Sequence, residues 1–316
     1  MKLNSLLKLF LLVLFAGTIA SCSTDDDDAT NGSEQTYATK VYITDAPVDN
    51  PEVTGTFITV SEVRVNGKAI ENFQKTTIEI SSFTNGKTEL LGELNLEAGT
   101  TSDIVLVLSE TDASGNGSGN YVLTADGQKH ALTQTATEIS VADSAEILAS
   151  AENQLVLDFD LRKSITSGAE NAYTFSSAAQ LRNSVRAVNT LKAGTITGNV
   201  SNMGNYDSEQ MLVFAYKKGD YNDSEKNPNS GGVRFANAVS SSVVNNSDGK
   251  FSLHFMEAGE YELYFHSYAD DNNDGKLEFE GQLEMAGSGN LNLNSVNVDA
   301  NSTVSVEVLF NGFLNL

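Results

Sequence analysis

Short alternations of apolar and polar residues run through most of this chain, and no long stretch has the 3.6-residue period of an amphipathic helix. Gln154–Leu161 shows the pattern most clearly: its odd-numbered residues are all apolar, whereas its even positions hold Gln154, Val156, Asp158 and Asp160. Successive side chains of a β-strand point to opposite faces, so this stretch is predicted to be a strand with one apolar and one largely polar face. Strands this short and regular predict an all-β fold of the sandwich type.

Two further features refine the predicted strands. Ile58 and Val60 share one phase of the alternation, whereas Val63 and Val65 share the other, which predicts a β-bulge or bend between the two pairs. Ala125–Gly127 separates two alternating stretches and predicts the turn of a β-hairpin.

The chain of 316 residues exceeds the usual size of one hydrophobic core and predicts two domains. The strand pattern restarts after Leu191, so we predict two β-sandwich domains in tandem, residues 38–190 and 191–316. Hydrophobic residues make up 40% of the chain, which is enough for folded cores. Because the chain has a single cysteine, no intrachain disulfide can stabilise either domain.

Residues 1–21 have the layout of a secretory signal peptide. Lys2 and Lys8 precede an apolar run, Leu9–Ala20, that ends in small residues just before Cys22. This run of about a dozen apolar residues is too short for a membrane-spanning helix, which needs roughly 20. The segment resembles the lipobox of bacterial lipoproteins, which implies that the Cys22 thiol is acylated, with chains such as palmitate, and anchors the protein stably. The alternative is a plain secretory signal followed by a free thiol.

Residues 22–37 are polar and acidic and predict a flexible tether. The four aspartates Asp25–Asp28 keep such a tether extended. The run Ser23–Asp28 also resembles the acidic export tag behind the acylated cysteine of Bacteroidetes lipoproteins. That resemblance implies attachment to the outer membrane with display at the cell surface.

Four motifs in the predicted first domain resemble a lipoprotein family called domain of unknown function 4382. They are Val41–Pro47, Ile58–Gly67, Leu96–Leu108 and Leu157–Ile165. The similarity extends over about residues 38–190. It implies a β-sandwich in a cell-envelope setting and no established activity.

The predicted second domain has the turn, strand, loop and strand order of another group of sandwiches. Ser247–Leu253 and Ala258–Leu263 form this hairpin-like pair, Thr195–Val200 begins the unit, and Val304–Phe310 closes it. The segment resembles carboxypeptidase-regulatory and transthyretin-like domains.

The charge and the histidines limit the classes of function. A net charge of −23 repels phosphate backbones, so no nucleic-acid partner is expected. The three histidines, His130, His254 and His266, are not accompanied by a nucleophile motif, and we expect no enzyme activity. His254 and His266 are predicted on the polar phases of neighbouring strands, where they could pair and hold a metal, but their spacing does not favour it.

Asp158 and Asp160 lie two residues apart on one predicted strand, so their carboxylates are expected roughly 7 Å apart on one face. That separation fits the acid and base of an inverting glycosidase. Arg162 would continue the same face and neutralise them. We therefore expect an exposed ladder of charges rather than a catalytic pair.

Two weaker signals concern carbohydrate. The chain has no tryptophan to stack on a sugar ring, but Tyr206, Tyr216 and Tyr221 lie near a long predicted loop and could take that role. Asp143–Ala145 resembles the three-residue O-glycosylation motif of exported Bacteroidetes proteins.

The segment Asp270–Glu278 predicts a calcium site. Oxygen donors recur at alternate positions, with a glycine sixth, as in the first part of an EF-hand loop. The predicted ligands are Asp270, Asn272, Asp274, the carbonyl group of Lys276, and Glu278. The bidentate glutamate of that motif is missing, because its position holds Gly281. The alternative is a turn whose Asp and Asn side chains cap their own backbone.

Together these features predict a lipid-anchored cell-envelope protein at the outer surface, with a non-catalytic binding or structural, adhesin-like role. Its expected partners are the membrane, through the lipid, and a glycan or another envelope protein. The alternatives are a carboxylate-dependent polysaccharide hydrolase and a glycan-binding accessory protein.

Overall fold

The computed structural model describes residues 35–46, 53–133, 136–168, 172–272 and 277–314. Cys22 and Asp25–Asp28 lie outside these ranges, so the signal peptide, the lipid and residues 22–34 of the tether stay predictions. The predicted tether is wrong at its end, because Thr36 and Tyr37 belong to the first strand, β1 (Thr36–Ala46). Residues 35–316 form one compact unit. Among the described residues, no helix has the length and apolar character needed to cross a membrane.

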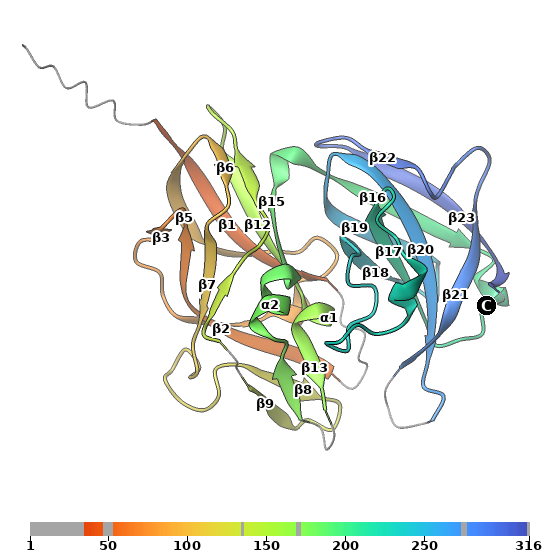
Figure 1. The fold of residues 1–316 in the computed structure, drawn as a ribbon, viewed down its shortest axis with the longest axis horizontal. Coiled ribbons are helices and arrows are strands. Elements are labelled where there is room, and N and C mark those ends of the chain that lie inside the picture. The colour runs from red at the N-terminus through yellow and green to blue at the C-terminus, as the bar shows by residue number, and fades with distance from the viewer. Residues whose placement is uncertain (1–34, 47–52, 134–135, 169–171, 273–276, 315–316) are drawn as a thin grey trace, which may run out of the picture. The chain divides into compact units, whose positions relative to one another are not determined.

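The fold is all-β, as predicted (Figure 1). A four-stranded sheet has the order β15 (Val185–Asn189), β12 (Asn153–Asp160), β1 (Thr36–Ala46) and β5 (Glu89–Glu97). β12 runs parallel to β1, with Leu157 opposite Ile43, and antiparallel to β15. The strand predicted at 154–161 is therefore confirmed in type, and it is paired on both sides.

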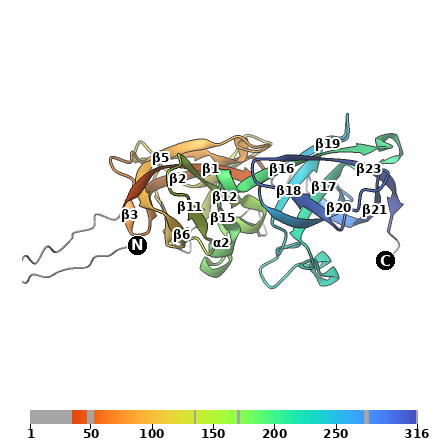
Figure 2. The ribbon, with the colours of Figure 1, turned by 90° about the horizontal axis from the view of Figure 1, so that it is seen from above.

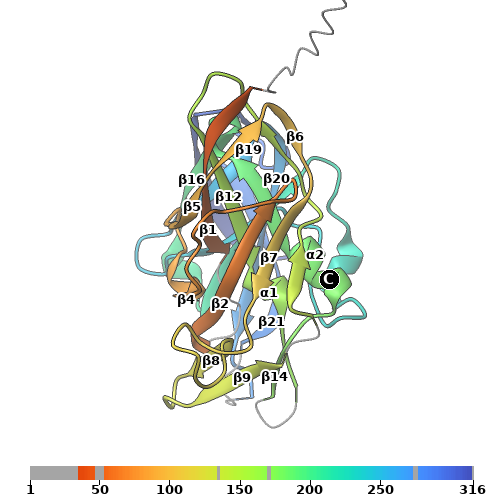
Figure 3. The ribbon, with the colours of Figure 1, turned by 90° about the vertical axis from the view of Figure 1, so that its left-hand side faces the viewer.

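The second sheet contains nine strands, of which seven follow in order along it (Figure 3). These are β10 (Glu138–Ser140), β7 (Ile104–Leu108), β2 (Val53–Val65), β8 (Tyr121–Thr124), β9 (Lys129–Thr133), β14 (Tyr173–Phe175) and β13 (Ile165–Ser167). Two short strands, β3 (Lys68–Ala69) and β4 (Thr76–Glu79), also pair with β2, and β6 (Gly99–Thr101) pairs separately with β11 (Ala145–Ile147).

Two local predictions are confirmed in this sheet. The register of β2 against β7 shifts between Val60 and Glu62, which is the predicted bulge. β8 and β9 pair antiparallel across the predicted turn Ala125–Gly127.

The strands after residue 192 form an eight-stranded sheet of their own (Figure 2). Its members are β18 (Ser240–Val244), β17 (Gln210–Lys217), β20 (Gly259–Ala269), β21 (Glu278–Gly287), β23 (Thr303–Phe313), β16 (Ala193–Ser201) and β19 (Lys250–Glu257), with β22 (Val296–Val298) paired to β20. This arrangement does not test the predicted division into two domains, which stays a prediction.

The buried apolar side chains of the described residues gather in three clusters. One cluster lies between the first two sheets and packs them into a sandwich. It contains, for example, Val41 and Leu157 from the first sheet and Ile58 and Leu106 from the second. The other two lie in the later part of the chain and use opposite faces of one strand: alternate residues of β17 enter different clusters. That strand is therefore covered on both sides.

The helices within the described ranges are short. They are α1 (Leu161–Ser164), α2 (Ala178–Ser184) and the 3-10 turns η1 (Ile80–Ser82), η3 (Thr190–Lys192), η4 (Met203–Asn205) and η5 (Asp223–Lys226). Asp160 caps α1, since its Oδ1 accepts a hydrogen bond from the Lys163 amide at 3.3 Å, while Ser164 Oγ donates to the Asp160 carbonyl at 2.6 Å. These bonds end β12 at Asp160, so Leu161 and Arg162 belong to a helix and not to the predicted strand.

Candidate functional site

A group of buried charged side chains lies where β12 passes into α1. Asp160 Oδ2 is 3.0 Å from Arg162 Nη2 and 3.3 Å from Lys163 Nζ. The Asp160 and Arg162 side chains are only 8% and 2% exposed. We call Asp158, Asp160, Arg162, Lys163 and Arg186 the ion network.

Burial by itself would raise the pKa of Asp160, but the cations of Arg162 and Lys163 hold this pKa below its usual value. Burial lowers the pKa of Lys163, and its attraction to Asp160 opposes that shift. The carboxylate is thus kept ionised by its neighbours, as a structural counter-ion would be.

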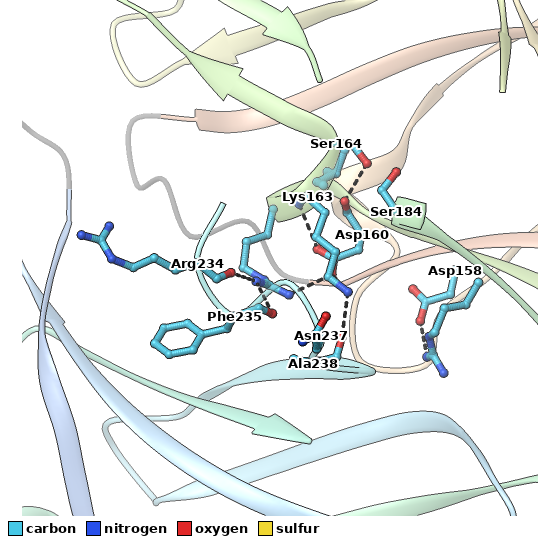
Figure 4. A network of polar contacts seen from close by, with 12 residues as sticks. Asp158, Asp160, Lys163, Ser164, Ser184, Arg234, Phe235, Asn237 and Ala238 are labelled. Carbon is cyan, nitrogen blue, oxygen red and sulfur yellow. Dashed lines mark hydrogen bonds and ion pairs between the residues drawn. The ribbon is translucent and has the colours of Figure 1, made fainter. Parts of the chain in front are cut away.

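The two cations also bind backbone far along the chain. Arg162 Nη1 donates to the carbonyl oxygens of Arg234, at 2.7 Å, and Phe235, at 3.2 Å. Lys163 Nζ donates to the Ala238 carbonyl at 2.7 Å. Figure 4 shows these carbonyl groups facing the ion network. The network therefore fixes the segment before β18 against the end of β12.

A second ion pair repeats this arrangement. Arg186 on β15 pairs with Asp158 on β12, and its Nη1 donates to the carbonyl oxygen of Phe255 at 3.2 Å. Despite burial, the Asp158 charge raises the pKa of Arg186 above its usual value. The arginine thus bridges a buried carboxylate and the backbone of β19.

Both aromatic residues that accept these arginine bonds have a strained backbone. Phe235 has φ 52° and Phe255 has φ 53°, in the left-handed region that bulky residues rarely adopt. This conformation costs roughly 1–2 kcal/mol per residue. Hydrogen bonds from charged donors to the two carbonyl groups offset that cost, because such bonds are stronger than neutral ones.

The predicted exposed ladder of charges is wrong. Asp158, Asp160 and Arg162 are 5%, 6% and 5% exposed. β12 has a neighbouring strand on each side, and the residues around Phe235 and Phe255 cover its polar face. Both carboxylates are bound to cations, so neither is placed to act as a free acid or base.

The two histidines of the possible metal pair are not adjacent. His254 lies on β19 and His266 on β20, and these strands are separated in the sheet. His266 is fully buried, not on a polar face as predicted. Within the described ranges, no three His, Cys, Asp or Glu side chains are grouped to hold a metal ion. His130 bonds through Nε2 to Thr124 Oγ1 at 3.1 Å.

His266 lies in an aromatic cage. Its ring centroid is 4.1 Å from that of Phe235 and 5.3 Å from that of Phe214. Neither ring nitrogen has a hydrogen-bond partner in the described part of the chain. Burial, with smaller effects from Lys226 and Arg162, lowers the pKa of His266 to about 3, so the ring is neutral at pH 7.

The tyrosines considered for sugar stacking are largely enclosed. Tyr216 is 0% and Tyr206 9% exposed, and the Tyr206 hydroxyl bonds to Ser267 Oγ at 3.0 Å. The Tyr221 ring stacks on Tyr264 with centroids 3.7 Å apart. Tyr206 and Tyr216 therefore offer no open face to a sugar.

The predicted calcium loop is only partly described. Asp274 and Lys276 lie outside the described residues. Glu278 accepts hydrogen bonds from the Asn272 side-chain amide at 3.1 Å and from the Asp271 backbone amide at 3.3 Å. These contacts are those of a capped turn, and calcium binding stays a prediction.

The tripeptide Asp143–Ala145 ends in the first residue of β11; Asp143 and Ser144 are half-buried and Ala145 is buried. The Asp143 carboxylate accepts from the Ser144 amide at 2.8 Å and from the Ala187 amide at 3.2 Å. The first residue of the motif thus has a structural role, and glycosylation of Ser144 stays a prediction.

Sequence reasoning missed Lys163, Arg186 and Arg234. One signal was available: Arg186 interrupts the otherwise apolar run Val185–Val188, as a buried cation with a partner would. The carbonyl acceptors could not be identified from the sequence, because every residue has a backbone carbonyl group.

A family model described as a domain of unknown function, DUF4382, matches residues 38–177. This match confirms the resemblance proposed for the first part of the chain. The lipoprotein and transthyretin-like resemblances are not covered by it and stay predictions. No curated protein matches the sequence.

Several solved structures show a distant likeness. The Bacillus anthracis TIE protein is 8% identical over 87% of this chain, with a TM-score of 0.19, and the chain spans only 34% of that protein. The major pilin subunit BcpA of Bacillus cereus is 10% identical, with 88% of this chain and 71% of that one covered and a TM-score of 0.22. A putative adhesin from Bacteroides ovatus is 11% identical, with 83% and 87% covered and a TM-score of 0.17. TM-scores this low do not indicate a shared function.

Proposed function

We propose that this chain is a lipid-anchored protein of the outer cell surface with a non-catalytic binding or structural role. The observation that carries the non-catalytic part is the ion network. Asp158 and Asp160, the pair that a polysaccharide hydrolase would need, are buried and paired with cations. An inverting glycosidase needs a carboxylic acid and a free carboxylate with a water between them.

The same network supports a structural role. Arg162, Lys163 and Arg186 each bond to backbone carbonyl groups on the later part of the chain. Such bonds between distant segments stiffen the unit 35–316, which suits a protein that presents a binding surface away from the membrane. The acylated Cys22 and the tether 22–37 would supply the attachment.

The experiment that tests catalysis uses the soluble protein, residues 22–316 carrying Cys22→Ala. It is incubated with neutral and acidic polysaccharides, and release of reducing ends is measured. We expect none above a heat-denatured control. Hydrolysis that Asp158→Asn abolishes in a variant with wild-type circular dichroism would overturn the non-catalytic role.

The anchoring is tested on cells. Cys22→Ala should move the protein into the aqueous phase during detergent phase separation, because only the lipid holds it. Replacing Asp25–Asp28 by alanine should keep the lipid and reduce protease accessibility on intact cells. A detergent-phase Cys22→Ala protein, or unchanged accessibility of the second variant, contradicts the respective part of the proposal.

A further inference from the structure

A groove of about 600 Å³ lies beside the ion network. β13 lines one side of it and the first residues of β21 line another, and the segment Gly231–Arg234 completes the wall. This volume falls within the usual range for small-ligand sites. Ile165, Leu277 and Phe279 contribute apolar surface to the groove.

Arg234 is held in place at this groove by two contacts. Its Nε donates to the Lys226 carbonyl oxygen at 2.9 Å, and its guanidinium lies 5.6 Å from the Phe279 ring centroid. Figure 4 shows the guanidinium pointing away from Asp160 and Lys163. An arginine fixed through Nε keeps its two terminal nitrogens in a preset fork.

The two terminal nitrogens of this fork are not engaged by any described residue. Among the residues that the structure describes, none accepts a hydrogen bond from the terminal nitrogens of Arg234, and no carboxylate forms an ion pair with it. Glu278 is the only acidic residue among the described residues that line the groove, and its carboxylate oxygens accept hydrogen bonds from the Asn272 side chain and the Asp271 amide. A fork of this kind matches the two oxygens of a carboxylate.

The charge around the groove is opposite to that of the chain. The described residues of its lining include two arginines, Arg162 and Arg234, and one glutamate, in a protein of net charge −23. The local charge attracts one anionic group, while the field of the whole molecule repels a polyanion. Ile165, Leu277 and Phe279 give part of this mostly polar groove an apolar surface, which can contact an uncharged body next to that group.

We propose that this groove binds a ligand with a single carboxylate and an uncharged body, and that Arg234 holds the carboxylate through both terminal nitrogens. The inference rests on the proposed binding role and adds the chemical class of ligand. Such a carboxylate could belong to a fatty-acid-like chain or to a uronic acid, and both present the same group to Arg234.

Calorimetric titration of the soluble protein, residues 22–316 with Cys22→Ala, tests this proposal. The probes are sodium hexanoate and sodium galacturonate, with hexanol and galactose as uncharged counterparts. We expect at least one of the two carboxylates to bind, and its uncharged counterpart to bind much more weakly. Binding of hexanoate indicates a fatty-acid-like ligand, and binding of galacturonate indicates a uronic acid.

Arg234→Gln should weaken binding about tenfold or more, because bonds to a charged group are lost. Arg234→Lys should retain part of the affinity as a point charge without the fork.

Arg64→Gln is the matched control, since Arg64 pairs with Glu138 and does not line the groove. If Arg234→Gln fails to fold, Ser167→Tyr narrows the groove from an exposed position and should also abolish binding. No binding of either carboxylate, or equal affinity in wild type and Arg234→Gln, overturns the proposal. Those outcomes leave the anchoring and the absence of hydrolysis untouched, whereas cleavage of polysaccharide would overturn the non-catalytic role alone.

Discussion

Asp160 Oδ2 lies 3.0 Å from Arg162 Nη2, although the two residues belong to different elements, β12 and α1. The other terminal nitrogen of Arg162 reaches the carbonyl oxygens of Arg234 and Phe235. One short stretch thus provides both a buried charge pair and a link to backbone more than 70 residues away.

Asp160→Asn should destabilise the protein strongly. It leaves the buried cations of Arg162 and Lys163 without their counter-ion, a loss of about 3–5 kcal/mol in the free energy of unfolding. Urea unfolding followed by circular dichroism measures this change. Glu138→Gln is the control, because it breaks the exposed pair with Arg64 and should have little effect. Equal midpoints for the two variants would show that the ion network is not structural.

His266 should make the protein less stable in mild acid. Its pKa in the folded state is lowered to about 3, whereas an unfolded histidine titrates near 6.5. The unfolded state therefore binds the proton first, and stability falls as the pH drops from about 6.5 toward 3. Linkage gives a loss of about 3 kcal/mol between pH 6.5 and pH 4.

His266→Phe tests this origin, because phenylalanine fits an aromatic cage and does not titrate. The variant should lose less stability than the wild type over that pH range in urea titrations. Parallel profiles for wild type and His266→Phe would refute the assignment.

Gly86→Ala should disturb the contact between the turn before β5 and β19. Gly86 has φ 77°, and a Cβ atom there would lie 2.6 Å from His254 Nδ1. Gly127→Ala is the matched control, since Gly127 has φ 80° and nothing within 4 Å of the added atom. Both changes strain the backbone, by roughly 1 kcal/mol or more. Only Gly86→Ala adds the clash, so its melting temperature should be the lower one.

A second substitution separates the two effects. In a His254→Ala background the ring is absent, and Gly86→Ala should then cost no more than Gly127→Ala. An unchanged cost in that background would mean that the His254 contact is not the cause.

Calcium should raise the melting temperature if Asp270–Glu278 binds it, because a ligand of the folded state stabilises that state. Differential scanning calorimetry in calcium and in chelator measures the shift. Asp270→Asn should reduce it, and Asp248→Asn, in the turn before β19, should not. Identical wild-type curves in calcium and chelator would leave only a capped turn.

The sequence alone determined the class of fold and several local features. The period-2 pattern of Gln154–Leu161 identified β12, the change of phase after Val60 located the bulge, and Ala125–Gly127 identified a hairpin. These features depend on residues close together in the chain, where alternation and turn chemistry act directly.

Only the tertiary structure decided what happens to the polar residues. Alternation separates the two faces of a strand, but it does not show what covers each face. Asp158 and Asp160 were therefore predicted to be exposed to solvent. In the structure they are buried, beside the backbone carbonyl groups of Phe235 and Phe255. His266 is enclosed for the same reason, because its cage includes Phe214 and Phe235 from other elements. Burial and charge pairing arise from segments far apart in sequence, and a local pattern carries no record of them.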